Sequence, residues 1–185
     1  MVITGATDGE CDRQRSHTKA KLKNRTKTGF PNFAGIGLEY AREFARRKHS
    51  LILLGRNEAK LQKVKDELKS LIPERNIVTI VCDFEKATVE EYKEVADKID
   101  SSKREIGILI NNAGVMYRSP NKLLDQSKKD DWAQVSVNCA ATVLITRACL
   151  SGMMKRKKGL IVNISSTAAY RPLPLMGVYS ASKVG

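Results

Sequence analysis

A tyrosine and a lysine near the end of the sequence, Tyr179 and Lys183, stand four residues apart. On a helix this spacing places both side chains on one face. A neighbouring ammonium favours the phenolate form of tyrosine, so such a tyrosine can exchange a proton with a carbonyl or an alcohol near neutral pH. The pair predicts acid–base chemistry on a carbonyl group, although a Tyr-x-x-x-Lys pattern by itself often arises by chance.

Apolar runs of strand length alternate along the chain with segments that have the periodicity of amphipathic helices. The strand-like runs cover residues 1–4, 51–54, 77–82, 106–110 and 160–164, and the helix-like segments cover 36–48, 57–71, 89–99, 129–154 and a stretch that begins near 177. This alternation predicts an α/β fold, a Rossmann-type doubly wound parallel sheet of about five strands. Because ligands of such sheets bind beyond the carboxyl ends of the strands, we expect the chemically active residues directly after each strand.

Glycines follow the first predicted strand and open the first predicted helix. Without residues 10–35 the chain would join Thr-Gly-Ala-Thr-Asp-Gly to Ile-Gly in one short turn. Such a turn lets a pyrophosphate approach the backbone, and the free N–H groups at the helix N-terminus can bind its oxygens. The residues predicted to form this phosphate turn are Gly5, Gly9, Gly35, Ile36 and Gly37.

Residues 10–35 interrupt the turn and differ from the rest of the chain. They carry seven lysines and arginines against two acidic residues, and they lack the periodicity of a helix or a strand. Connections at this place usually take about 2–6 residues, so we expect the insert to be disordered and to weaken cofactor binding by separating Gly9 from Gly37. The codons at both ends of the insert can contain intron boundary sequences, so we hypothesise a retained intron. A basic loop that binds a partner is the alternative.

Arg56, rather than an acidic residue, follows the second predicted strand. A carboxylate near this point would bind the free 2′-hydroxyl of the NADH ribose, whereas an arginine can pair with the 2′-phosphate of NADPH. Arg56 therefore favours NADPH as the cofactor, with a solvated arginine before a helix as the alternative interpretation.

Residues 1–9 and 36–185 resemble the short-chain dehydrogenase/reductase family in the order of their motifs. The split glycine turn is followed by Asp83, by Asn111-Asn112-Ala113-Gly114, by Asn138, by Ser166 and by Tyr179-Ser-Ala-Ser-Lys183. The resemblance implies four catalytic residues. Tyr179 would donate the proton, Ser166 would orient the substrate oxygen, and Lys183 and Asn138 would support the relay. Ser165 is the adjacent alternative to Ser166, which the interval of thirteen residues to Tyr179 favours.

The same resemblance assigns further residues to the cofactor. It implies that Asp83 contacts the adenine amino group and that Tyr179 and Lys183 lie at the nicotinamide end, where Lys183 would hold the ribose. The Asn-Asn-Ala-Gly motif would stabilise the sheet and pack against the cofactor through Asn112, Ala113 and Gly114.

Within the family, residues 4–9, 36–47, 51–61 and 80–84 resemble the branch of microsomal 17β-hydroxysteroid dehydrogenases and very-long-chain 3-oxoacyl-CoA reductases. The resemblance implies NADPH-dependent reduction of a steroid ketone or a 3-oxoacyl-CoA, in lipid metabolism such as fatty acid elongation, at the endoplasmic reticulum. Members of this branch carry an N-terminal membrane segment and continue past the lysine. We therefore expect residues 1–185 to be a fragment of one NAD(P)-binding domain, soluble, without a membrane span and without the C-terminal strands. In such a fragment the last helix would be poorly anchored and one sheet edge exposed.

The formal net charge of +13 raises the question of a nucleic-acid partner. The insert 10–35 concentrates +5 of this charge in 26 residues, which leaves +8 over the other 159, and no aromatic residues interleave with the other basic residues as stacking platforms would. We therefore expect no nucleic-acid partner. Four cysteines, Cys11, Cys82, Cys139 and Cys149, lack the spacing of a metal site and are expected to be reduced and structural, with no metal bound.

Three functions follow from these residues. The first is a ketoreductase whose partner is a small lipid or steroid ketone. The second is an inactive fragment that acts at most as a binding or dimerising module, and a homodimer is compatible with either of these two. The third, a basic nucleic-acid binder, rests on the insert alone.

Overall fold

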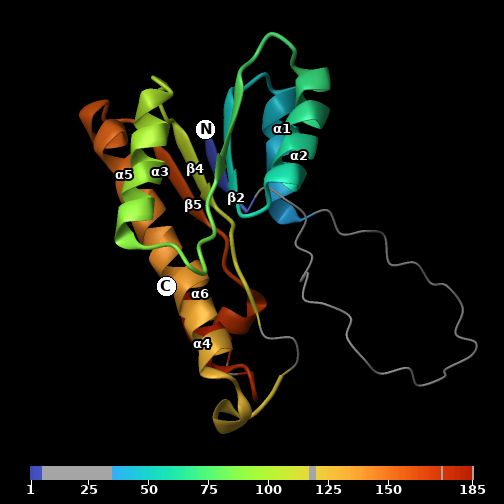
Figure 1. The fold of residues 1–185 in the computed structure, drawn as a ribbon, viewed down its shortest axis with the longest axis vertical. Helices are drawn as coiled ribbons and strands as arrows, with labels where there is room; N and C mark the ends of the chain where they lie inside the picture. The colour runs from blue at the N-terminus through green and yellow to red at the C-terminus, as the bar shows by residue number, and fades with distance from the viewer. Residues whose placement is uncertain (6–34, 117–119, 172, 185) are drawn as a thin grey trace, which may run out of the picture.

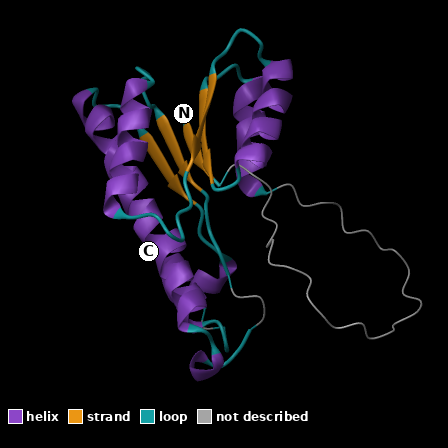
Figure 2. Ribbon diagram, viewed as in Figure 1, coloured by secondary structure: helices purple, strands orange, loops and turns teal. Residues whose placement is uncertain are grey.

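Five parallel strands form the centre of the structure, with helices on both faces (Figures 1 and 2). This computed structural model describes residues 1–5, 35–116, 120–171 and 173–184. The strands are β1 (Val2–Thr4), β2 (Leu51–Gly55), β3 (Ile77–Val81), β4 (Ile108–Asn111) and β5 (Leu160–Asn163). Their order in the sheet is β3-β2-β1-β4-β5, so the Rossmann-type parallel sheet is confirmed. The insert expected to be disordered, residues 10–35, lies outside the described residues except for Gly35.

The helices are α1 (Ile36–Arg46), α2 (Glu58–Leu71), α3 (Val89–Ser101), α4 (Lys128–Gln134), α5 (Ala141–Lys155) and α6 (Gly177–Val184). Polar side chains begin three of them by accepting hydrogen bonds from the first turn. Asn57 caps α2, Ser127 caps α4, and Thr88 forms a reciprocal capping box with Glu91 in α3. Each of these caps follows the turn residues that end the preceding segment, so the start of each helix is encoded locally.

Two apolar cores lie on the two faces of the sheet. Side chains alternate along β2, because Leu51 and Leu53 face one core while Ile52 and Leu54 face the other. Helices α1 and α2 cover the first core, and α3 and α5 cover the second (Figure 1). Strands buried on both faces explain why the sequence of β2 is uniformly apolar rather than alternating.

The predicted helix over 129–154 is real but is not uniformly α-helical. Between α4 and α5 the residues Val135–Ala140 form a π-helical turn, which sequence periodicity did not reveal. Within the run Lys128–Lys155 an 18-residue stretch has a mean hydropathy of 1.3, so by length and composition alone this helix could cross a membrane. In this fold the side chains of Ile145, Cys149 and Met153 in α5 are buried against the sheet, as expected of a core helix.

The carboxyl ends of the strands point toward the end of the molecule where α4 and α6 lie (Figure 2). None of the residues of α6 is buried, as expected of a helix with little packing, but α6 forms hydrogen bonds to two other elements. Ser182 in α6 accepts a hydrogen bond from Asn138, and Lys183 donates one to the Ile164 carbonyl after β5. At the edge of the sheet, Leu160 of β5 is 53% exposed, as expected of an uncovered edge.

The described cysteines are free thiols, as expected of reduced structural cysteines. Burial raises the pKa of Cys149 to about 12 and that of Cys82 to about 11, so both stay protonated at neutral pH. Cys139 is half-buried in the π-helical turn and donates a hydrogen bond to the Ser182 carbonyl. Cys11 lies outside the described residues.

The replacement Leu53→Ala tests the packing of the sheet. Leu53 is fully buried in β2, and its loss would leave a cavity that the strands cannot close. We expect the free energy of unfolding to fall by about 2–5 kcal/mol in a urea titration. The same change at Leu124, which is 96% exposed, should have no comparable effect. Equal effects of the two changes would contradict this core.

Candidate functional site

Hydrogen bonds of Thr4 and Asn112 connect the carboxyl ends of β1 and β4. The buried Thr4 hydroxyl accepts hydrogen bonds from the N–H groups of Asn112 and Ala113 at 3.0 and 3.1 Å. The Asn112 side-chain amide donates to the carbonyls of Thr4 and Gly5 at 3.3 and 3.0 Å. These bonds position the loop after β4 directly beside the end of β1.

Glycines bring the start of α1 against the same point. A Cβ atom at Gly37 would lie 2.5 Å from Nδ2 of Asn112 and 2.7 Å from the Gly5 carbonyl, so no side chain fits there. Gly5 adopts φ +61°, which L side chains rarely adopt, and a Cβ on it would lie 2.8 Å from Cα of Ala113. The two glycines therefore permit three backbone segments to meet.

The N-terminus of α1 lies beside this meeting point. Gly35 is its N-cap residue, and no side chain of the described residues caps the first turn. A helix N-terminus without a side-chain cap offers free N–H groups and the positive end of the helix dipole to an anion. The predicted turn residues Gly5, Gly35, Ile36 and Gly37 thus lie together, whereas Gly9 lies outside the described residues.

Asn138, in the π-helical turn, links the loop after β4 to α6. Its Oδ1 accepts from the Val115 N–H at 2.8 Å, and its Nδ2 donates to the Val115 carbonyl at 3.0 Å. The same Nδ2 donates to the Ser182 hydroxyl at 2.8 Å, and Ser182 in turn donates to the Tyr179 carbonyl. Asn138 is 7% exposed, so these bonds satisfy a buried amide and fix the position of α6.

Lys183 and Asn138 converge over Gly114. A Cβ atom at Gly114 would lie 3.0 Å from Nζ of Lys183 and 3.4 Å from Oδ1 of Asn138, so the bare glycine leaves room for both. Nζ of Lys183 donates to the Ile164 carbonyl at 3.0 Å. Burial lowers the pKa of Lys183 from its ordinary value, an effect that the nearby Cys139 thiol partly opposes.

Ser166 and Tyr179 belong to neighbouring elements at the same end of the sheet. The Ser166 hydroxyl accepts from the Ala168 N–H at 3.2 Å and caps the 3-10 helix Thr167–Ala169, which packs against α6. Its own proton is left to donate elsewhere. The alternative, Ser165, donates its proton to the Lys183 carbonyl at 2.6 Å. Among the described residues, no hydrogen bond joins the half-buried Tyr179 hydroxyl to Ser166 or Lys183.

Arg56 and Asp83 lie at the other end of this edge, after β2 and β3. Nη1 of Arg56 is 3.8 Å from Oε2 of Glu85, and the Arg56 side chain is 46% exposed. Oδ1 of Asp83 accepts from the Glu85 N–H at 3.3 Å, which fixes the turn after β3. The side chains of both predicted adenosine-binding residues are therefore accessible beside the start of α2.

Sequence reasoning missed three residues that shape the site: Thr4, Ser182 and Glu85. Thr4 ends a strand and Ser182 lies inside the Tyr179–Lys183 spacing, so their positions contained a signal. Glu85 had none, because its partner Arg56 lies 29 residues earlier and the two meet only through the pairing of β2 with β3.

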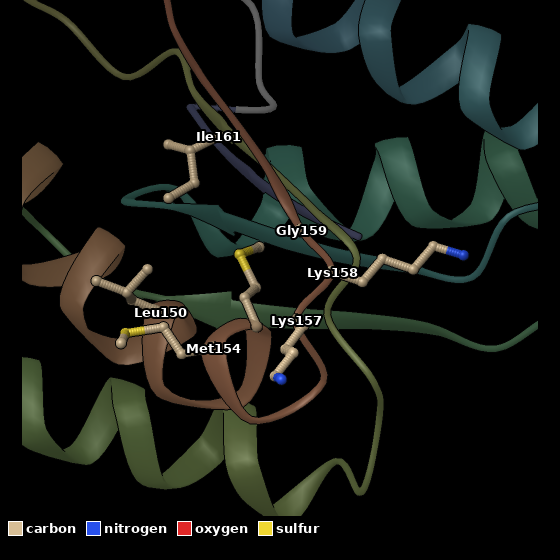
Figure 3. Close-up of a pocket in the computed structure, with 7 residues that line it drawn as sticks. Leu150, Met154, Lys157, Lys158, Gly159 and Ile161 are labelled. Carbon is tan, nitrogen blue, oxygen red and sulfur yellow. The ribbon is translucent and has the colours of Figure 1, made fainter.

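One surface pocket lies away from these residues. It measures about 330 Å³ and is lined by the end of α5 and the start of β5, including Leu150, Met154 and Ile161 (Figure 3). The amino end of β5 lies there, at the opposite pole of the sheet from Gly5 and Asn112. We therefore do not assign it to the candidate site.

The replacement Thr4→Val tests the junction of β1 and β4. It keeps the shape of the side chain but leaves the N–H groups of Asn112 and Ala113 without the acceptor that they now share. We expect a loss of about 1–3 kcal/mol in the free energy of unfolding, measured by urea denaturation. The control is Thr79→Val, the same exchange on the half-buried edge strand β3. Equal stability of the two variants would show that the Thr4 hydroxyl does not carry the junction.

Comparison with known proteins agrees with this arrangement. The family described as short chain dehydrogenase matches residues 31–185. A very-long-chain 3-oxoacyl-CoA reductase of Coccidioides immitis is 36% identical over 149 residues, 80% of this chain and 42% of that protein. The human protein named inactive hydroxysteroid dehydrogenase-like protein 1 is 41% identical over 150 residues, 80% of this chain and 44% of that protein. The chain thus spans less than half the length of these curated relatives.

Solved structures share the fold. A serine dehydrogenase in a closed form complexed with NADP⁺ is 28% identical and superposes with a TM-score of 0.75, covering 99% of this chain and 60% of that one. The family match covers most of the sequence and includes every described strand except β1, and the resemblance of the motifs extends to that strand as well. On these grounds the chain belongs to the short-chain dehydrogenase family.

Proposed function

We propose that this chain forms the cofactor-binding and catalytic part of an NADPH-dependent oxidoreductase that reduces a ketone. The observation that carries the proposal is the convergence of Lys183, Asn138 and Gly114 beside the meeting point of Gly5 and Gly37. An ammonium group and an open helix N-terminus at the same edge of a parallel sheet suit a dinucleotide on one side and a polar reaction on the other.

The described residues fit a nicotinamide dinucleotide along this edge. The open N-terminus of α1, with Gly5, Gly35, Ile36 and Gly37, would bind the pyrophosphate, because only glycine leaves the backbone accessible there. Asp83 would bind the adenine, and Arg56 would bind a 2′-phosphate. Asn112, Ala113 and Gly114 would lie along the middle of the cofactor, and Tyr179 and Lys183 would lie at its nicotinamide end. When bound, NADPH would supply the hydride for the substrate carbonyl.

The protein's own groups would supply the proton and hold the oxygen. As negative charge develops on the carbonyl oxygen, the Tyr179 hydroxyl would donate its proton to it and form the alcohol. The Ser166 hydroxyl, whose proton is free of the Ala168 contact, would donate a hydrogen bond to the same oxygen. Lys183 would stabilise the resulting phenolate, since opposite charges attract strongly where burial limits solvation. Asn138 would hold α6 in place and support the return of a proton.

The substrate class rests on relatives. The 36% identity to a very-long-chain 3-oxoacyl-CoA reductase, together with the resemblance to steroid dehydrogenases, supports a 3-oxoacyl-CoA or a steroid ketone as substrate. Residence at the endoplasmic reticulum is proposed on the same ground. The choice between the two substrates depends on a pocket that the described residues do not form.

A second candidate is an inactive binding module. The name of the human relative, which is 41% identical, describes that protein as inactive. Tyr179 and Lys183 are both present in this chain and occupy one helix, α6, which favours the active alternative. The two candidates differ in whether a bound cofactor is oxidised.

The replacement Tyr179→Phe tests the proposed proton donor. We expect NADPH oxidation with a 3-oxoacyl-CoA or a steroid ketone to slow by about 10²–10⁴-fold, because the carbonyl oxygen loses its proton donor. Binding of NADPH, followed by its fluorescence, should change little.

The matched control is Tyr170→Phe, because Tyr170 is 87% exposed. Its rate should equal that of the unchanged chain. A chain that binds NADPH but does not oxidise it with either substrate would instead support the inactive module, and a chain that does not bind NADPH would contradict both candidates.

A further inference from the structure

The Arg56–Glu85 pair lies where the proposed function places the 2′-position of the cofactor's adenosine. Nη1 of Arg56 is 3.8 Å from Oε2 of Glu85, and the Glu85 side chain is only 11% exposed whereas that of Arg56 is 46% exposed. The carboxylate is thus largely withdrawn from water, whereas the guanidinium is half-exposed. No acidic residue follows β2 directly. The fold nevertheless brings the carboxylate of Glu85, from the turn after β3, next to Arg56 at the end of β2.

The turn after β3 holds the Glu85 backbone in place. Its N–H donates to Asp83, and the carbonyl of Asp83 accepts from Lys86 and Ala87 at 3.0 and 2.9 Å. Phe84 is buried and its ring stacks on Tyr92 at a centroid distance of 6.0 Å. Glu85 therefore cannot move far from Arg56 without disturbing a core contact, whereas Arg56 has a long and half-exposed side chain that can move.

A dianionic 2′-phosphate and the Glu85 carboxylate would compete for the same guanidinium. At 3.8 Å the existing pair is loose, so a phosphate that offers two oxygens to the fork of the guanidinium can replace it. The carboxylate then stays nearby and repels the phosphate, and its burial weakens the screening of that repulsion by water. A ribose 2′-hydroxyl, by contrast, meets no repulsion and can donate a hydrogen bond to a carboxylate.

We propose that Glu85 is a specificity-determining residue that restrains the preference for NADPH over NADH by competing for Arg56. The inference rests on the proposed function, because it assumes that Arg56 faces the 2′-position of a bound dinucleotide. Arg56 determines that NADPH is preferred over NADH, and Glu85 determines how strong that preference is. Removing the negative charge of Glu85 without changing its shape therefore strengthens the selection for a 2′-phosphate.

The test uses the whole chain and two probes that differ only in the 2′-phosphate, adenosine 2′,5′-bisphosphate and 5′-AMP. Calorimetry gives the ratio of their dissociation constants for the unchanged chain and for Glu85→Gln. We expect the variant to shift this ratio toward the bisphosphate by about 2- to 5-fold, the upper part of the range typical of an exposed charge pair. Glu85→Asp keeps the charge, so its ratio of dissociation constants should stay close to that of the unchanged chain. If Glu85→Asp folds, position 85 tolerates substitution, and a shift in Glu85→Gln then reflects the lost charge.

The matched control is Glu94→Gln on α3, whose carboxylate is 4.0 Å from Lys98 and 69% exposed. It removes the same charge from the chain and should leave the ratio unchanged. Arg56→Gln should abolish the preference for the bisphosphate.

Two results would overturn the inference. If Arg56→Gln abolishes the preference while Glu85→Gln leaves the ratio unchanged, the cofactor assignment stands and the role of Glu85 is wrong. If the unchanged chain shows no preference for the bisphosphate and Arg56→Gln has no effect, the assignment of NADPH to this edge fails together with the inference.

Discussion

The site depends on how closely three backbone segments approach one another at Asn112. Its side-chain amide donates to the ends of β1, and Gly37 at the start of α1 lies so near that any side chain would collide with it. The Thr4 hydroxyl completes the junction by binding the N–H groups that follow β4. Because an unpaired buried N–H is costly, these contacts constrain the strand ends as one unit. This junction positions the N-terminus of α1, the loop that contains Gly114, and α6.

Most of the fold could be predicted from the sequence because its signals are local. The uniformly apolar run of β2 and the caps at Asn57 and Thr88 each determine structure within a few residues. The restricted ways in which parallel strands connect then leave only a few possible orders of the strands. The π-helical turn at Val135–Ala140 could not be predicted, because its extra residue per turn leaves the apolar periodicity on both sides intact.

The candidate site was predictable where one residue type satisfies a backbone requirement. Gly5 is needed because the backbone there has a positive φ, and Gly37 is needed because Asn112 approaches it closely. The position of Gly5 after a strand and that of Gly37 at a helix start indicate both requirements in the sequence. Contacts between side chains that lie far apart in sequence could not be inferred. Ser182 binds Asn138 across 44 positions, and the pairing of Arg56 with Glu85 requires the finished sheet. The roles of Tyr179 and Ser166 stay predictions, since the described contacts do not join them.

The π-helical turn has a consequence for how this helix tolerates changes of length. One additional residue in a turn rotates everything beyond it by about 100° relative to a regular α-helix. Here the buried faces on both sides of the turn, Ala133 before it and Ile145 after it, nevertheless point into the protein. Deleting one residue within the turn would let it close into a regular α-helix with both faces still buried, whereas inserting one more residue would turn one of these faces outward. Natural variants of this chain should therefore tolerate the loss of one residue in this turn better than a further insertion.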